Sequence, residues 1–242
     1  MNETDGSGVK SAERALSILE LFSRPNRALT FTQVAELLGY PRSSLHGLLR
    51  TLTDRGWLRL DPGSRRFTLG LRAWEAGSAY RPANELCRAA KPVVHHLRST
   101  LDSAVHVSVL DDGDAVAVLH SDDDASRRIG AHAVSCGRVL LAHLDRAQVE
   151  KRVAGRVDAP VDELHRELEQ VRDRGWAEGD GELVDGERTI AVPLRDRSGT
   201  VVAALAVTAP PDRLEGQGRE QALDALRQAA DTLAPALEPV AR

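Results

Sequence analysis

One short segment, residues 42–55, carries the side chains with the clearest potential for chemistry. Four leucines recur at three- and four-residue spacings, which places them on one apolar stripe of a helix: Leu45, Leu48, Leu49 and Leu52. Polar side chains at the start and on the opposite side of that helix can hydrogen bond to base edges and phosphates of DNA. They are Arg42, Ser43, Ser44, His46 and Arg50. An ordinary amphipathic helix has the same pattern, so the segment alone leaves both interpretations open.

A helix directly before this one would have to position it. Thr30 and Gln33 have the spacing of a capping box, which predicts a helix start, and Gly39 breaks that helix. Pro41 suits the first turn of the second helix, where its missing N–H costs nothing. Two short helices joined in this way predict a helix-turn-helix.

A basic hairpin follows the two helices. Two short strands are predicted on either side of residues 61–64, whose sequence DPGS is typical of a turn. Arg59, Arg65 and Arg66 flank this turn, where guanidinium groups can contact phosphates without reading base sequence. With a further helix over residues 12–22, the hairpin completes a predicted winged helix-turn-helix.

Cys136 is a candidate nucleophile elsewhere in the chain. A thiol at the start of a helix can have a lowered pKa, and His132 lies close to it in sequence. No third residue that would orient the base can be identified. A small cysteine beside Gly137 is more often a packing residue. The sequence therefore predicts no catalytic residue, and a cysteine-dependent hydrolase is the alternative.

The eight histidines do not show the spacing of a zinc site. If residues 111–114 close a hairpin symmetrically, Leu110 pairs with Ala115 and His106 with Leu119. That register puts His106 and His120 on opposite faces of the hairpin, where they cannot share an ion. We therefore expect neither a metal nor another cofactor.

Length and charge indicate two domains of different character. The chain has 242 residues, 42% hydrophobic and 28% charged, with a net charge of −4. Residues 1–80 contain 11 basic and 8 acidic residues, a net charge of +3, which leaves 21 basic and 28 acidic residues, a net −7, for the rest. A basic head on an acidic body suits a nucleic-acid module joined to a domain that does not bind nucleic acid.

The compartment is expected to be the cytoplasm. The leader, residues 1–8, has neither a basic nor an apolar region of the kind a secretion signal needs. No apolar run approaches the roughly 18 residues of a membrane span, so no membrane partner is expected. The only two cysteines, Cys87 and Cys136, are too few for a disulfide framework.

Residues 71–82 predict a linker helix between the domains, with Leu71 and Trp74 on an apolar stripe that a second copy would cover. Residues 83–242 predict an α+β domain, in which strand pairs at 104–121 and 188–208 carry helices on one face. Helices are predicted over residues 82–100, 135–144, 146–154, 161–174 and 218–237.

Residues 9 to about 80 resemble the winged helix-turn-helix domain of the IclR family of bacterial transcriptional regulators. The resemblance rests on three strings: VKSAERALSIL from residue 9, PRSSLH from residue 41 and FTLGLR from residue 67. It divides the chain into a DNA-binding domain (9–70), a linker helix (71–82) and a GAF-like effector-binding domain (83–242). Gly47 departs from the larger polar residue often found at its position, which would change base preference.

The second half resembles the family's effector-binding domain in the strings HAVSCGR from residue 132, IAVPL from residue 190 and AALAV from residue 203, and in the segment 175–186. Residues 129–131 (Ile-Gly-Ala) and Thr189 depart from the family pattern. The resemblance implies an effector pocket that includes Ile129, Ser135, Cys136, Asp180, Thr189, Ala206 and Thr208. Ser135 is expected to be the N-cap of a helix that begins at residue 136.

The resemblance implies a transcriptional regulator, and not an enzyme, whose affinity for a pseudo-palindromic double-stranded DNA operator is controlled by a small molecule. The expected assembly is a homodimer or a dimer of dimers, and the expected target is an adjacent catabolic operon. Hydroxyl groups beside a helix start, without a full cationic charge, would suit a carboxylate or a polyhydroxylated effector. An architectural DNA-binding protein without an effector is a further alternative.

Overall fold

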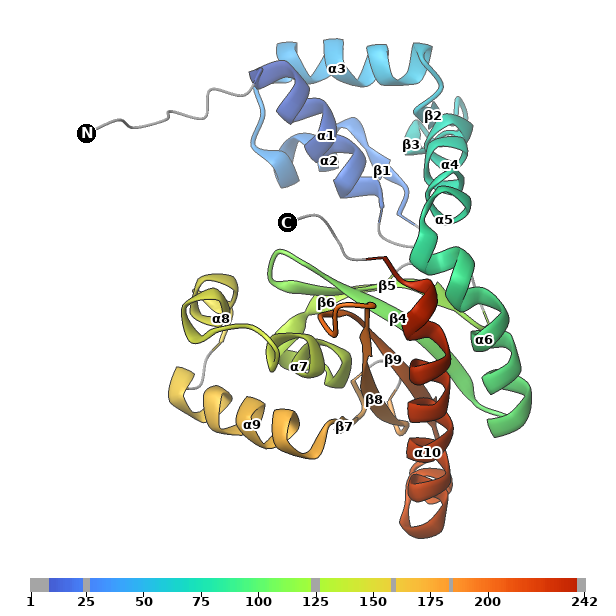
Figure 1. Cartoon of the computed structure of the whole chain (residues 1–242). Helices are drawn as coiled ribbons and strands as arrows, with labels where there is room; N and C mark the ends of the chain where they lie inside the picture. Colours follow the sequence, from blue (N-terminus) through green and yellow to red (C-terminus); the bar gives the residue numbers. More distant parts are fainter. Residues whose placement is uncertain (1–8, 24–26, 123–126, 158–159, 183–184, 239–242) are drawn as a thin grey trace. The chain divides into compact units, whose positions relative to one another are not determined.

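The chain divides into two compact units, Met1–Tyr80 and Arg81–Arg242, each taken separately below. The computed structural model describes residues 9–23, 27–122, 127–157, 160–182 and 185–238 (Figure 1). The polar leader, residues 1–8, lies outside the described residues. No helix in these ranges is long and apolar enough to cross a membrane.

The first unit is a winged helix-turn-helix, as predicted. Its elements are α1 (Lys10–Phe22), β1 (Leu29–Thr30), α2 (Phe31–Leu38), α3 (Arg42–Asp54), β2 (Leu58–Leu60) and β3 (Arg66–Leu69). β1 pairs antiparallel with β3 and adds a third strand to the expected hairpin, in the order β1-β3-β2. This two-residue strand is too short for a sequence pattern to reveal.

Local signals in the sequence account for the helix ends. Thr30 and Gln33 form the predicted capping box, and Gly39 ends α2 with the positive φ of 63° that glycine adopts without strain. The α3 helix begins at Arg42. Pro41 is its N-cap residue, whereas we expected Pro41 to lie within the first turn. Its apolar stripe packs on α1 and α2 in a core that includes Ile18, Val34, Leu45, Leu49, Leu52 and Phe67.

The linker begins with α4 (Leu71–Ser78) and continues through α5 (Tyr80–Ala83). No residue of α4 is buried, and the side chains of Leu71 and Trp74 are each 68% exposed. The predicted apolar stripe is therefore open to solvent within this chain.

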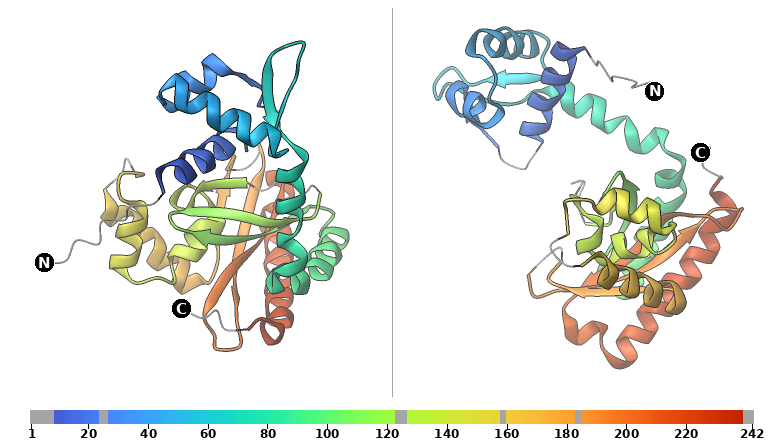
Figure 2. Two further views of the ribbon diagram at one scale, coloured as in Figure 1. Left: turned by 90° about the horizontal axis from the view of Figure 1, so that it is seen from above. Right: turned by 90° about the vertical axis from the view of Figure 1, so that its left-hand side faces the viewer.

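The second unit is built on a six-stranded antiparallel sheet in the order β6-β5-β4-β9-β8-β7 (Figure 2). Its strands are β4 (Ala104–Asp111), β5 (Asp114–His120), β6 (Arg127–Gly130), β7 (Ala177–Asp180), β8 (Arg188–Arg195) and β9 (Val201–Ala209). Both predicted hairpins, β4–β5 and β8–β9, are present. Strands β4 and β9 also pair with each other and join the two hairpins into one sheet.

Helices cover both faces of this sheet, so the prediction of a single covered face is wrong. One face carries α6 (Glu85–Leu101) and α10 (Gly216–Leu233), packed on large aliphatic side chains such as Val105, Val107, Ile190 and Leu205. The other face carries α7 (Ser135–Leu141), α8 (Arg146–Val153) and α9 (Val161–Arg174), packed on small side chains such as Ala191, Ala204 and Ala206. Period-two alternation along each strand produces this division.

A β-bulge alters the register of the β4–β5 hairpin. Leu110 pairs with Ala115 as predicted, but Ser108 pairs with Ala117 and Val107 with Leu119, so Val118 is the extra residue. Beyond the bulge His106 pairs with His120, not with Leu119. A bulge inserts one residue into one strand and thereby moves the following side chains to the other face.

We predict that Thr30→Ala destabilises α2 by about 0.5–2 kcal/mol, because the Ala side chain cannot accept the Gln33 N–H, which lies 3.4 Å from Thr30 Oγ1. Native-state hydrogen exchange of the α2 amides measures this change. Thr32→Ala is the control, since Thr32 is exposed in the first turn of the same helix. Equal protection of α2 in both variants would contradict the prediction.

Candidate functional site

The outward face of α3 is available to contact DNA. Ser43, His46 and Arg50 are exposed, whereas the leucines of the opposite face are buried. Arg50 lies 3.6 Å from Asp54, one turn along the helix, and both side chains are mostly exposed. Exposed ion pairs of this kind contribute little, so Arg50 can exchange Asp54 for a base edge at low cost.

Not all the predicted DNA-binding residues have free side chains. Ser44 Oγ accepts a hydrogen bond of 3.1 Å from Arg14 Nη1 and so joins α1 to α3. Arg66 Nη1 donates to the Ala28 carbonyl at 2.7 Å, which ties β3 to the segment before β1. Each of these two side chains therefore has a structural contact within the DNA-binding unit.

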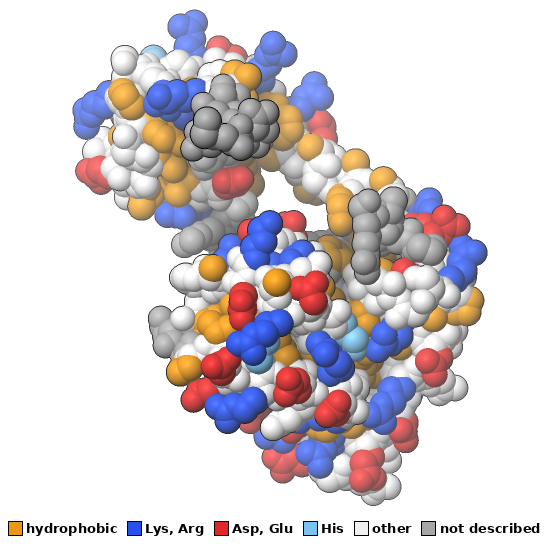
Figure 3. Space-filling model, turned by 60° about the vertical axis from the view of Figure 1, so that its left-hand side comes forward, with side chains coloured by type: hydrophobic (Ala, Val, Ile, Leu, Met, Phe, Trp, Pro, Cys, Tyr) orange, Lys and Arg blue, Asp and Glu red, His pale blue; other side chains and the backbone are white. Residues whose placement is uncertain are grey.

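The turn of the hairpin is ordered by Asp61, which accepts from the N–H and the hydroxyl of Ser64. Arg65 follows with a positive φ of 56° and an exposed side chain. Together with His46 and Arg50 of α3, Arg65 lines a hollow between the recognition helix and the hairpin. Figure 3 shows basic side chains projecting at several places on the visible face of this unit.

A small cavity, about 20 Å³ in volume, opens on the α7 face of the second unit. Four predicted effector residues line it: Ile129, Ser135, Cys136 and Thr189. Eight lining residues were missed by sequence reasoning: His106, Ser108, Ala115, Ala117, His120, Arg127, Val134 and Glu182. The alternation of polar His106 and Ser108 with Val105 and Val107 could have revealed the first two.

Two buried polar atoms of this cavity have no hydrogen-bond partner among the described residues. One is Nδ1 of His106, a residue that is 2% exposed, and the other is Oγ of Ser135, a residue that is 0% exposed. Buried polar groups are almost always paired in folded proteins, so atoms of this kind indicate a bound water or ligand. Burial lowers the pKa of His106 to about 3, which keeps the imidazole neutral.

The cysteine in the cavity lacks the features of a nucleophile. Cys136 Sγ lies 3.3 Å from His106 Nε2, so His106, not His132, is the neighbouring imidazole. Burial raises the pKa of Cys136 to about 12, so the sulfur is a thiol at neutral pH. A protonated thiol beside a neutral imidazole is not an activated pair.

The two histidines that were expected on opposite faces lie together in the cavity. The rings of His106 and His120 stack with centroids 5.7 Å apart and planes inclined by 9°. The bulge at Val118 is the reason, because it moves His120 onto the face of His106. No group of three or more His, Cys, Asp or Glu in the described parts of the chain could hold a metal ion.

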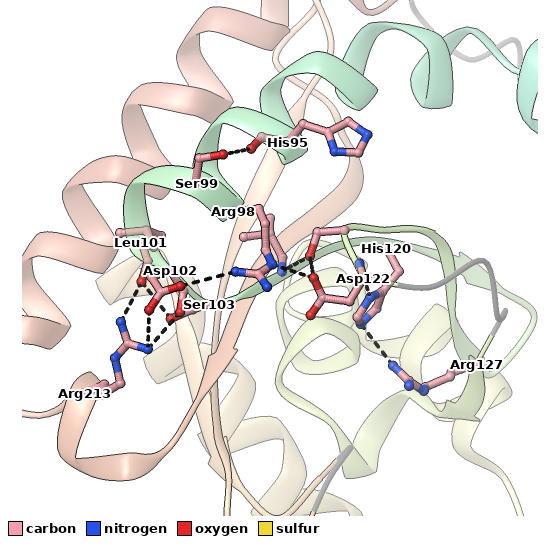
Figure 4. A network of polar contacts seen from close by, with 12 residues as sticks. His95, Arg98, Ser99, Leu101, Asp102, Ser103, His120, Asp122, Arg127 and Arg213 are labelled. Carbon is pink, nitrogen blue, oxygen red and sulfur yellow. Dashed lines mark hydrogen bonds and ion pairs between the residues drawn. The ribbon is translucent and has the colours of Figure 1, made fainter.

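A polar network extends from His120 to α6 (Figure 4). Arg127 Nη1 lies 3.0 Å from His120 Nε2, and the Asp122 N–H lies 3.3 Å from Nδ1 of the same ring. Arg98 of α6 donates from Nε to Asp122 Oδ1 at 2.5 Å. Asp122 also accepts from Ser121 at 2.9 Å. The ring of His120 thus links a side chain of the cavity to an ion pair with α6.

The start of α7 differs from the prediction. The helix begins at Ser135 and its N-cap is Val134, so Ser135 is not the capping residue. The Ser135 N–H instead donates to Glu182 Oε2 at 2.7 Å, and Glu182 Oε1 accepts from Arg138 Nη2 at 2.6 Å. Gly179 leaves the space for this pair, because a Cβ atom there would collide with the Glu182 carboxylate.

Three predicted effector residues do not line the cavity. Asp180 accepts from Arg188 at 2.6 Å on the opposite face of the sheet, since Gly179 pairs with Thr189 on the cavity face. The hydrogen bond from Arg188 lowers the pKa of Asp180. Ala206 is buried and pairs with His106 on the neighbouring strand. Thr208 Oγ1 lies 2.9 Å from Thr189 Oγ1. Thr208 therefore contacts Thr189, which lines the cavity.

A helix-turn-helix with an exposed recognition face, joined to a unit that encloses a polar cavity, defines the class of DNA-binding transcriptional regulators. The family model for the IclR helix-turn-helix domain matches residues 11–62, and the model for the bacterial transcriptional regulator IclR C-terminal domain matches residues 79–234. The chain belongs to the IclR family of bacterial transcriptional regulators, whose members are not enzymes.

Individual relatives agree with this assignment. The glycerol operon regulatory protein of Streptomyces coelicolor is 30% identical over 92% of this chain and 94% of its own. The HTH-type transcriptional regulator XynR of Escherichia coli is 29% identical over 95% of this chain and 97% of its own. The fold is shared with an IclR homolog from Microbacterium hydrocarbonoxydans solved with 4-hydroxybenzoate, at a TM-score of 0.76 and 24% identity, covering 94% and 98% of the two chains.

We predict that a thiol reagent such as iodoacetamide leaves both cysteines of the native protein unmodified at pH 8. Cys87 and Cys136 are buried, and at a pKa of about 12 roughly one Cys136 in 10⁴ is a thiolate at that pH. Reaction is expected only after unfolding in urea or well above pH 8, as the thiolate fraction rises. Mass spectrometry measures the modification. Rapid alkylation of native Cys136 at pH 7 would instead support a nucleophile.

Proposed function

We propose that this protein binds an operator through α3 and the hairpin, and that a small molecule in the cavity controls its operator affinity. The observation that supports an effector most directly is the pair of buried, unpartnered atoms in the cavity, His106 Nδ1 and Ser135 Oγ. Desolvating such groups without a partner costs about 1–3 kcal/mol each, which a ligand that pairs them would recover.

The cavity chemistry favours a hydroxylated carboxylate over a polyhydroxylated compound. Arg127 lines the cavity and supplies the cationic charge that the sequence interpretation left out, so an anionic group has a partner. His106 and Ser135 offer neutral hydrogen-bonding atoms to a hydroxyl group. Apolar walls from Ala115 and Ile129 suit a ligand with an apolar body. The 4-hydroxybenzoate in the Microbacterium homolog has this chemistry.

The proposed assembly is a homodimer or a dimer of dimers on a pseudo-palindromic operator. The support is the stripe of Leu71 and Trp74 on α4, because exposed apolar side chains of this size are usually covered in an assembly. A two-fold axis through paired α4 helices would present two recognition helices to two half-sites.

We propose a cytoplasmic protein without a cofactor and without catalytic activity, acting on an adjacent catabolic operon. The high pKa of Cys136 argues against the alternative of a cysteine hydrolase. The polar cavity argues against an architectural DNA-binding protein, because such a protein binds no effector. Operator position relative to the promoter would decide between repression and activation.

We predict different effects for two arginines of the DNA-binding unit. Arg50→Ala should lower affinity for the specific operator by about 1–3 kcal/mol and leave random DNA nearly unaffected, because it removes a base contact. Arg65→Ala should weaken both equally and lower the salt slope by about one, because it removes a phosphate contact. Fluorescence anisotropy on a duplex selected from random DNA by the wild-type protein measures both. An unchanged specificity ratio in Arg50→Ala would remove Arg50 from the base readers.

We predict that Arg127→Gln weakens binding of a carboxylate effector by about 1.5–3 kcal/mol, because it removes a charge-assisted hydrogen bond. The control is Arg128→Gln, since Arg128 is the next residue of β6 and pairs with Asp111 and Asp114 outside the cavity. Calorimetry with hydroxylated carboxylates, 4-hydroxybenzoate among them, is compared with the corresponding amides. Equal affinity for an acid and its amide would contradict an anionic effector.

A further inference from the structure

The geometry points to His120 as a tautomer switch that carries occupancy of the cavity to α6. This inference rests on the proposed effector function and adds the route by which the effector acts. The switch comprises His120, the cavity residue Arg127, and the ion pair between Asp122 and Arg98 of α6 (Figure 4).

An effector in the cavity cannot act on α6 through direct contact. The cavity lies on the face of the sheet that carries α7, whereas α6 packs with α10 on the opposite face. The side chains between them are close-packed aliphatic groups such as Val105 and Val107, which are fully buried. The polar network at the end of β5 passes around this packed layer.

α6 is the element on which a signal would have to act. It is the first long helix of the effector unit and directly follows α4 and α5 in the chain, which lead from the DNA-binding unit. Its last turn is attached to the β5 end by Arg98, which donates to Asp122 at 2.5 Å and lies 3.6 Å from Asp102. A change in the position of Asp122 therefore reaches α6 through a charged contact.

The ring of His120 has a donor at each nitrogen, and it cannot accept from both. A guanidinium group only donates, so the 3.0 Å contact with Arg127 requires Nε2 to accept. In the neutral form of the ring, the proton is then on Nδ1, which excludes a hydrogen bond from the Asp122 N–H 3.3 Å away. The two donors therefore compete for the single acceptor position of one imidazole.

An anionic ligand resolves this competition. A carboxylate accepts from Arg127 more strongly than a neutral imidazole does, so Arg127 turns from His120 to the ligand. The ring then loses the proton at Nδ1 and gains one at Nε2, with no change of charge, and Nδ1 accepts from the Asp122 N–H. Ligand binding thus strengthens the contact between His120 and Asp122 and shifts the ion pair that attaches α6.

The test uses a built-in anion, Arg127→Glu, which places a carboxylate beside His120 without any ligand. We expect operator affinity to change about fivefold or more in this variant, as for a typical allosteric coupling. Arg227→Glu is the control for net charge, since Arg227 is exposed on α10. Circular dichroism checks that each variant is folded, and the duplex selected by the wild-type protein is the DNA.

The second arm removes the route and keeps the anion. The double variant Arg127→Glu/Asp122→Asn should have the same operator affinity as the single variant Asp122→Asn. Likewise, Arg127→Glu/Arg98→Gln should have the same operator affinity as Arg98→Gln. ¹⁵N NMR of the His120 ring should report a proton on Nδ1 in the wild type and on Nε2 in Arg127→Glu. A change that persists in both double variants, no change in Arg127→Glu, or one tautomer in both proteins would overturn the inference.

The effector itself separates this inference from the proposed function. If a carboxylate that binds the cavity releases the operator equally from the wild type and from Asp122→Asn, the His120 route is wrong and effector control stands. If hydroxylated carboxylates have no effect on the wild type but Arg127→Glu acts through Asp122, the proposed effector class is wrong and the switch stands.

Discussion

The unequal chemistry of the two faces of the antiparallel sheet is the constraint on which the effector unit depends. Alternate residues of β4, β8 and β9 point to opposite sides. On one side, large aliphatic residues such as Val107 and Ile190 fill the space under α6 and α10. On the other side, small and polar residues such as Ala191 and His106 leave room below α7. The close-packed face stabilises the unit, and the face with small and polar side chains contains the cavity.

The cavity combines groups that a stable core normally avoids. A buried imidazole with a pKa of about 3 and an unpartnered serine hydroxyl both cost free energy unless a partner enters. In contrast, the Glu182 carboxylate at the cavity is already paired with Arg138. The cavity therefore contains unsatisfied neutral groups beside a satisfied ion pair. Burial keeps Cys136, although it lies beside an imidazole, in the thiol form at neutral pH.

In the DNA-binding unit, the buried core residues and the exposed polar residues lie on opposite sides of one helix, α3. Leu45 and Leu49 anchor α3, so its other side can carry Arg50 and His46 at the surface. The hairpin adds Arg65 to the same hollow. Arg66 has a different role, because its bond to the Ala28 carbonyl holds the small sheet together. Of these two neighbouring arginines, Arg65 therefore faces the hollow, whereas Arg66 has a structural contact.

Local patterns in the sequence determined the winged helix-turn-helix, the capping box at Thr30 and the two hairpins, because capping, turn and periodicity signals act over a few residues. Only the tertiary structure decided that helices cover both faces of the sheet, that His106 and His120 stack, and that Arg127 and Glu182 reach the cavity. The bulge at Val118 has no signature in an alternating apolar strand, yet it reverses every face assignment after it. Asp180 shows the same limit, since its side of the sheet follows from its pairing with Arg188, which residue types alone do not fix.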